Sequence, residues 1–253
     1  MKMHDINPER EDVILLLHPM FANAEMMQEL LADPLGDSFR YLIPDLCGHG
    51  EAAGESWQSA AGEAAQIRSW LAAHHIDRLQ LGFGASMGGV ILLELLWFPE
   101  LQFDRLFFEG VPLPENARWL NRLMTHVMVK KHRKASLSME RTVEKMGQLY
   151  GRQAAPFMAR EIIGIDEESI ARIMWDCCHV RLPELDAARQ ARCVFAFGEK
   201  DGDLKFARKV LPEHYPQAAQ VVWPGCGHCT HVTEDNVNYA SMLRAYLYGD
   251  IPQ

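Results

Sequence analysis

The chain has 253 residues, of which 48% are hydrophobic, enough apolar material for one large globular core. Its formal net charge of −9 disfavours contact with phosphate backbones, so we expect no nucleic-acid partner. The N-terminus lacks an apolar signal segment and the longest apolar run, residues 90–98, is too short to span a bilayer, so we expect a cytoplasmic protein without a membrane partner.

Short aliphatic runs alternate with helical patterns along the chain. Residues 13–17 are continuously aliphatic, which is typical of a parallel strand buried on both faces. In chain order, the pattern predicts strand 13–17, helix 24–31, strand 40–43, helix 56–75, strand 78–83, helix 87–98, strand 104–108, strand 192–197, helix 203–211, strand 220–223 and helix 236–247. This alternation indicates an α/β fold with a mostly parallel central sheet flanked by helices.

The stretch from 111 to 187 has no clear strand. Apolar residues recur there at helical spacing, at Trp119, Leu120, Leu123, Met124, Val127 and Met128, and further helices are expected over 138–150 and 168–178. We interpret residues 111–187 as a helical cap over a hydrolase-like core of residues 1–110 and 188–253, the two forming one structural unit. Trp119, Met124 and Met128 are candidates for contact with an apolar substrate, since methionine adapts to varied shapes.

The pentapeptide Gly84-Ala85-Ser86-Met87-Gly88 fits the G-x-S-x-G pattern between a predicted strand and a predicted helix. Such a sharp turn lifts a serine oxygen above the sheet, and small neighbours permit the close packing that it requires. The helix that begins at Met87 directs its free N–H groups toward the serine. We therefore predict Ser86 as a nucleophile.

A serine nucleophile needs a base, and the base needs an orienting acid. Asp201 and His228 each follow a predicted strand, at the edge of the sheet where catalytic residues gather. Along the chain the nucleophile comes first, then the acid, then the histidine, which is the order expected when the serine lies on such a strand-to-helix turn. Asp203 and His231 are the competing acid and base, and the spacing of the glycines favours the first pair.

Taken together, these segments resemble the α/β-hydrolase superfamily over nearly the whole chain. The elbow continues as Met87-Gly88-Gly89, and Asp45 with Gly48-His49-Gly50 resembles the loop after the second of these strands. The resemblance implies an oxyanion hole formed by the backbone N–H groups of Met87 and Met20, although Pro19 replaces the usual glycine. Phe21, the residue after Met20, is a further candidate for substrate contact. Since only about a dozen residues precede the first aliphatic strand, we expect a shortened N-terminal edge that lacks one or both of the family's first two strands.

The activity implied by the resemblance is serine-dependent hydrolysis of a carboxylic ester or thioester with a small to medium apolar acyl group. It needs a small-molecule substrate and no metal or organic cofactor. Carbon–carbon bond hydrolysis, or a ligand-binding receptor that retains the triad without turnover, are the alternatives. The choice between a monomer and a homodimer stays open.

A cysteine–histidine segment and a basic run each have more than one interpretation. The segment from Cys226 to Cys229 contains His228 and can be interpreted as a metal cluster, but its spacing favours buried thiols beside a histidine. Without a secretory signal the cysteines are expected to be reduced. The basic run over residues 130–134 is typical of a solvated helix end, with an anionic substrate such as a coenzyme A thioester, or a membrane surface, as the alternatives. His18 and His49 are expected to support their loops.

Overall fold

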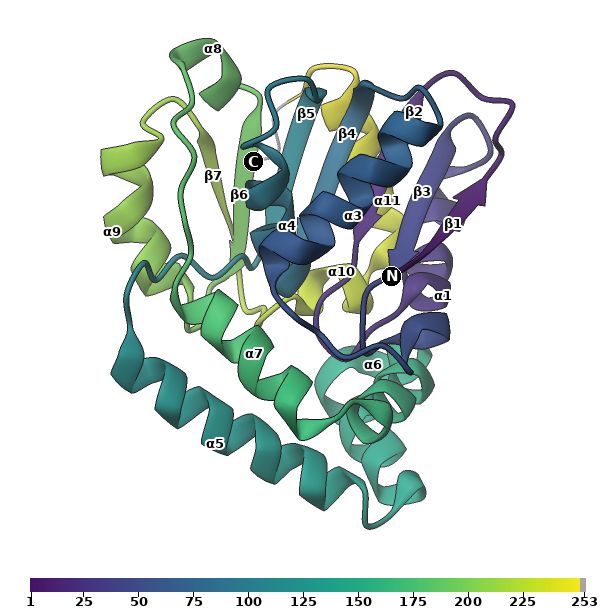
Figure 1. The fold of residues 1–253 in the computed structure, drawn as a ribbon, viewed down its shortest axis with the longest axis vertical. Coiled ribbons are helices and arrows are strands. Elements are labelled where there is room, and N and C mark those ends of the chain that lie inside the picture. Colours follow the sequence, from purple (N-terminus) through teal and green to yellow (C-terminus); the bar gives the residue numbers. More distant parts are fainter. Residues whose placement is uncertain (251–253) are drawn as a thin grey trace.

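A seven-stranded sheet forms the centre of the computed structural model, which describes residues 1–250 (Figure 1). The strand order is β1-β3-β2-β4-β5-β6-β7, and every pairing is parallel except that of β1 with β3. The strands are β1 (Lys2–Ile6), β2 (Val13–Leu17), β3 (Arg40–Asp45), β4 (Arg78–Ala85), β5 (Gln102–Glu109), β6 (Cys193–Gly198) and β7 (Ala219–Trp223). The predicted fold class is confirmed.

The sequence pattern did not predict strand β1. Its residues are mostly half-exposed, and only β3 pairs with it, so no buried alternation marks it in the sequence. The N-terminal edge is nevertheless short as expected, because a single strand precedes β2.

The helices of the core cover both faces of the sheet. Leu15 and Leu17 of β2 pack on the face with α3 (Ala60–Ala73) and α4 (Met87–Leu95), and Ile14 and Leu16 pack on the other face. The second face carries α1 (Ala24–Met27), the π-helix η1 (Gln28–Ala32), α2 (Asp33–Leu35), α10 (Thr230–Glu234) and α11 (Asn236–Leu247). The remaining short elements are η2 (Gly50–Ala52), α8 (Ala187–Gln190) and α9 (Leu204–His214).

Three helices between β5 and β6 cross one end of the sheet (Figure 1). They are α5 (Arg118–Ala135), α6 (Met139–Gly164) and α7 (Glu167–Cys178). Helix α6 extends well beyond the expected residues 138–150 and bends at Gly151, whose φ is 82°. Within residues 1–250, no helix is both long enough and apolar enough to cross a bilayer. The boundaries 111 and 187 for a cap stay a prediction.

Two carboxylates, the buried Glu161 and the half-buried Asp176, join α6 and α7 to the core. Asp176 of α7 accepts hydrogen bonds from the indole N–H of Trp57 at 2.9 Å and the backbone N–H of Ala60 at 2.7 Å. Glu161 of α6 accepts from the side-chain amide of Asn23 at 2.9 Å and the backbone N–H of Gly50 at 3.0 Å. Helix α5 differs, because Ala135 is its one fully buried residue. It forms the outermost layer of the cap.

Candidate active site

Ser86 occupies a strained turn between β4 and α4. Its φ is 49°, a conformation that non-glycine residues rarely adopt. The turn is tightly packed: a Cβ atom on Gly88 would lie 2.3 Å from the carbonyl oxygen of Leu17, and one on Gly84 would lie 2.6 Å from that of Gly88. Only glycine fits both positions, so these residues form the elbow that the sequence predicts.

The three residues predicted as a triad lie in contact. His228, on the loop between β7 and α10, places its Nε2 atom 2.9 Å from Ser86 Oγ and its Nδ1 atom 2.9 Å from Asp201 Oδ2. The side chain of Asp201 is only 1% exposed, whereas that of His228 is 36% exposed. A buried carboxylate therefore orients a half-exposed imidazole toward the hydroxyl. This is the geometry in which a histidine can remove the proton of a serine.

Burial by itself would lower the pKa of His228, but Cys229 and Asp201 beside it outweigh burial and raise that pKa well above its ordinary value. The Asp201 carboxylate provides a direct physical reason, since it stabilises the imidazolium.

The competing acid and base lie farther from the reacting atoms. The Oδ2 atom of Asp203 is 3.7 Å from His228 Nδ1, and burial raises the pKa of Asp203 to about 6. The ring of His231 packs against Trp223, with the ring centroids 4.6 Å apart. Asp203 therefore contributes a second carboxyl near the imidazole, whereas the half-buried His231 packs against Trp223 and Tyr239.

Two backbone amides predicted for an oxyanion hole, those of Met20 and Met87, belong to residues that line the same cavity as Ser86. Within residues 1–250, neither amide has a protein acceptor.

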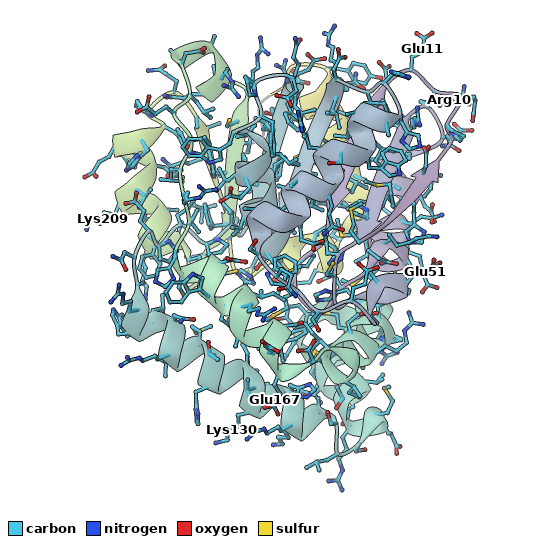
Figure 2. The ribbon with its side chains drawn as sticks, viewed as in Figure 1. Arg10, Glu11, Glu51, Lys130, Glu167 and Lys209 are labelled. Carbon is cyan, nitrogen blue, oxygen red and sulfur yellow. The ribbon has the colours of Figure 1, made fainter. Side chains whose placement is uncertain are left out.

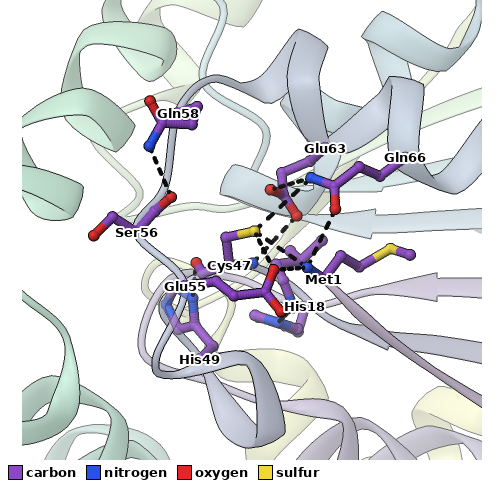
Figure 3. A network of polar contacts seen from close by, with 10 residues as sticks. Met1, His18, Cys47, His49, Glu55, Ser56, Gln58, Glu63 and Gln66 are labelled. Atoms are coloured by element: carbon purple, nitrogen blue, oxygen red, sulfur yellow. Dashed lines mark hydrogen bonds and ion pairs between the residues drawn. The ribbon is translucent and has the colours of Figure 1, made fainter.

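The loop that carries Met20 is held by two buried histidines, which Figure 3 shows in their surroundings. His18 donates from Nδ1 to the carbonyl oxygen of Pro19 at 2.8 Å, and its Nε2 accepts from the backbone N–H of Leu46 at 3.2 Å. His49 accepts from the backbone N–H of Phe21 at 3.3 Å. Burial lowers the pKa of His18 to about 4 and that of His49 to about 3, so both are neutral. Their bonds support the loops, as the sequence suggests.

A buried carboxyl group beneath the elbow was not foreseen from the sequence. Glu109 ends β5, and its Oε2 atom accepts hydrogen bonds from the indole N–H of Trp223 at 3.0 Å and the hydroxyl of Tyr239 at 2.8 Å. Burial raises the pKa of Glu109 to about 7. Its backbone oxygen also accepts from the Ser86 amide at 2.8 Å. Nothing in the linear pattern indicates these contacts, because the partners come from distant elements.

A cavity of about 720 Å³ opens above Ser86, between the core and the three cap helices. Phe21, Met124 and Met128 line it, as expected from the sequence. Trp119 does not: its side chain is 67% exposed and lies outside the lining, where the next residue, Leu120, takes its place. The structure thus places three of the four expected substrate contacts in the cavity.

Other lining residues were missed. Met26, Met27 and Leu30 reach the cavity from α1 and η1, and Tyr150 reaches it from α6. Tyr150 stands next to Gly151, where α6 bends, and its pKa is raised chiefly by burial. Gly151 is the sequence signal at the bend itself, because glycine adopts a positive φ readily.

Among residues 1–250, the thiols of Cys226 and Cys229 do not lie in a group of side chains that could bind a metal ion. The metal-capable donors that lie together among residues 1–250 are Asp201, Asp203 and His228, which already form the hydrogen-bonded site. The Sγ atom of Cys229 instead lies 3.5 Å from the carbonyl oxygen of Glu109.

Comparison with known proteins identifies a family and a shared fold. The model of the Alpha/beta hydrolase family matches residues 14–241. No curated protein sequence matches the chain significantly. Among solved structures, a thermophilic esterase from Thermogutta terrifontis has a TM-score of 0.73 and 16% identity, covering 97% of this chain and 92% of its own.

Two further structures show the same similarity. An esterase from Exiguobacterium antarcticum has a TM-score of 0.71 and 16% identity, covering 98% of this chain and 95% of its own. A meta-cleavage product hydrolase, CumD, has a TM-score of 0.67 and 18% identity, covering 98% and 94%. At such low identities the similarity establishes a shared fold.

Proposed function

The chain belongs to the alpha/beta hydrolase family, and on this premise we propose that it is a serine hydrolase that cleaves carboxylic esters or thioesters. The observation that carries the proposal is the continuous hydrogen-bonded path from Asp201 through His228 to Ser86, with 2.9 Å at each step.

In the proposed reaction, His228 removes the proton of Ser86 as its Oγ atom attacks the carbonyl carbon. Asp201 stabilises the imidazolium that forms, and the amides of Met20 and Met87 hold the developing oxyanion. His228 then gives its proton to the leaving alcohol or thiol, which departs as the acyl-serine forms. Water, activated by the same histidine, releases the acid and restores Ser86.

The cavity supports an apolar acyl group of small to medium size. Most of its wall is apolar, and methionines from both the core and the cap contribute to it, at Met20, Met26, Met27, Met87, Met124, Met128, Met146, Met158 and Met174. Such side chains adapt to flexible substrates. The esterases among the solved structures support the same reaction class.

The test is an assay of the purified protein and its Ser86→Ala variant on p-nitrophenyl esters of two to ten acyl carbons. We expect multiple turnovers by the native chain and a loss of kcat of about 10⁴-fold or more in the variant. A Cys229→Ser variant, which keeps the triad, controls for thiol chemistry. Full activity of Ser86→Ala in a folded protein would eliminate the serine mechanism.

The similarity to CumD supports one other reaction, hydrolysis of a carbon–carbon bond. The same triad can serve it, and a meta-cleavage product is the appropriate probe. Turnover of that compound together with inactivity on every ester would favour this second candidate.

A further inference from the structure

One part of the cavity lining is strongly basic, although the chain as a whole carries a net charge of −9. The basic side chains come from the end of α5, the beginning of α6 and the beginning of α9: Lys130, Lys131, Lys134, Arg141, Lys145 and Lys205. The acidic side chains of the lining are Asp201 and Asp203, both beside His228. The cap side of the cavity therefore presents uncompensated positive charge.

Within residues 1–250, none of these six side chains lies within ion-pair distance of a carboxylate. Arg133 of the same run behaves differently. It forms an ion pair with Glu167 at 2.6 Å and does not line this cavity. The run thus divides into a paired residue outside the cavity and three unpaired, solvent-exposed lysines in its lining, Lys130, Lys131 and Lys134. Helix α5 itself contains no acidic residue.

Helix stability does not explain this arrangement. Positive charge at the end of α5 suits the helix dipole, which accounts for Lys134. Arg141, however, lies in the first turn of α6, where the dipole disfavours positive charge, and Lys145 lies in the second turn, where the dipole gives it no support. The pKa of Lys131 is lowered by burial and by the nearby charge of Lys145. Two neighbouring cations that repel each other favour the binding of an anion beside them.

We propose that this basic wall, formed by Lys130, Lys131, Lys134, Arg141 and Lys145, binds an anionic group of the substrate. The substrate class is then an ester or thioester in which an apolar segment separates the reacting carbonyl from a carboxylate or phosphate. This inference rests on the proposed serine hydrolase function for the identity of the reacting bond. The anion can belong to the acyl chain or to the leaving group.

Binding is measured first, so that the result does not depend on turnover. The Ser86→Ala protein is titrated calorimetrically with monomethyl octanedioate, which carries one carboxylate, and with dimethyl octanedioate, which carries none. We expect the anionic ester to bind at least about tenfold more tightly, and the difference to shrink at high salt. The inference would be overturned if, at low salt, the charged and uncharged ligands bound equally well both in this pair and in the pair of octanoyl thioesters described next. That conclusion would hold whatever the outcome of the esterase assay.

The position of the anion is tested with a second matched pair. Octanoyl-coenzyme A carries phosphates on the leaving group, and octanoyl-N-acetylcysteamine is its uncharged counterpart. A preference for monomethyl octanedioate alone assigns the basic wall to the acyl end, and a preference for octanoyl-coenzyme A alone assigns it to the leaving group.

Variants connect the preference to these residues. In the Lys131→Ala/Lys145→Ala protein, the ratio of affinities for the preferred charged ligand and its uncharged counterpart should fall toward one. Arg208→Ala/Lys209→Ala is the matched control, because it also removes two positive charges, from exposed residues of α9 that do not line the cavity. Lys209 projects from the outer side of α9 (Figure 2). A ratio that stays high in the double variant, or that falls equally in the control, would contradict the assignment to the basic wall.

Discussion

The backbone amide of Ser86 donates a 2.8 Å hydrogen bond to the carbonyl oxygen of Glu109, the last residue of the neighbouring strand β5. This bond links the strained turn at the end of β4 to an adjacent, fully buried strand end. A strained non-glycine conformation costs on the order of 1–3 kcal/mol and persists where its surroundings fix it. The sheet therefore holds the proposed nucleophile in place before any substrate binds.

The first prediction concerns the packing of the elbow. In Gly88→Ala the new methyl group would lie 2.3 Å from the carbonyl oxygen of Leu17, so the strand or the helix must move. We expect a loss of stability of about 1–3 kcal/mol and a fall in kcat of about 100-fold, because the loop of Met20 follows Leu17 directly. Gly164→Ala, where no atom lies within 4 Å, is the control and should keep both values. Wild-type kinetics in Gly88→Ala would show that the tight packing is unimportant.

The core strands and the proposed triad could be predicted because local patterns encode them. Aliphatic runs mark the buried strands. Gly84 and Gly88, on either side of Ser86, mark a turn in which a larger residue at either position would clash. Strand β1 could not be recognised, since its pairing with β3 is set by distant residues. The prediction for the cap failed in a similar way, because Trp119 was expected to line the cavity and its neighbour Leu120 lines it instead. Helix α5 buries so little that its apolar pattern does not specify which side faces the cavity.

The second prediction concerns the pH dependence of activity. The proposed mechanism needs neutral His228, and its raised pKa means that the protonated form persists above pH 6.5. We expect kcat/KM to rise with pH and to level off only above the ordinary histidine value of 6.5, with a tenfold change per pH unit on the acidic limb. In Asp201→Asn the limb should move to lower pH, because the carboxylate no longer stabilises the imidazolium, and kcat should fall by about 10³–10⁴-fold. A limb at the same pH in both proteins would mean that another group controls it.

The third prediction concerns stability and Glu109. Its pKa is raised from an ordinary value of 4.5 to about 7, so between these values the folded protein holds a proton that the unfolded chain has released. The contribution of Glu109 to the free energy of unfolding should therefore fall by about 3 kcal/mol as the pH rises from about 4.5 to about 7.

Glu109→Gln removes this titration while retaining an acceptor for Trp223 and Tyr239. Chemical denaturation across that pH range should show that the stability of the variant, relative to the native protein, improves steadily as the pH rises. A constant difference at all pH values would show that Glu109 does not titrate in this range.

The fourth prediction concerns the depth of the cavity. Met128 of α5 lines it, and Met128→Trp adds volume inside the space proposed for the acyl chain. Each methylene in an apolar pocket is worth about 1–3 kcal/mol of discrimination, so kcat/KM for p-nitrophenyl octanoate should fall at least about tenfold relative to the acetate. Leu123→Trp adds comparable bulk on the same helix at a residue that is 51% exposed and outside the lining. That variant should keep the native preference for chain length. If both variants change the preference equally, the effect arises from disturbance of α5, and the acyl chain then occupies another part of the cavity.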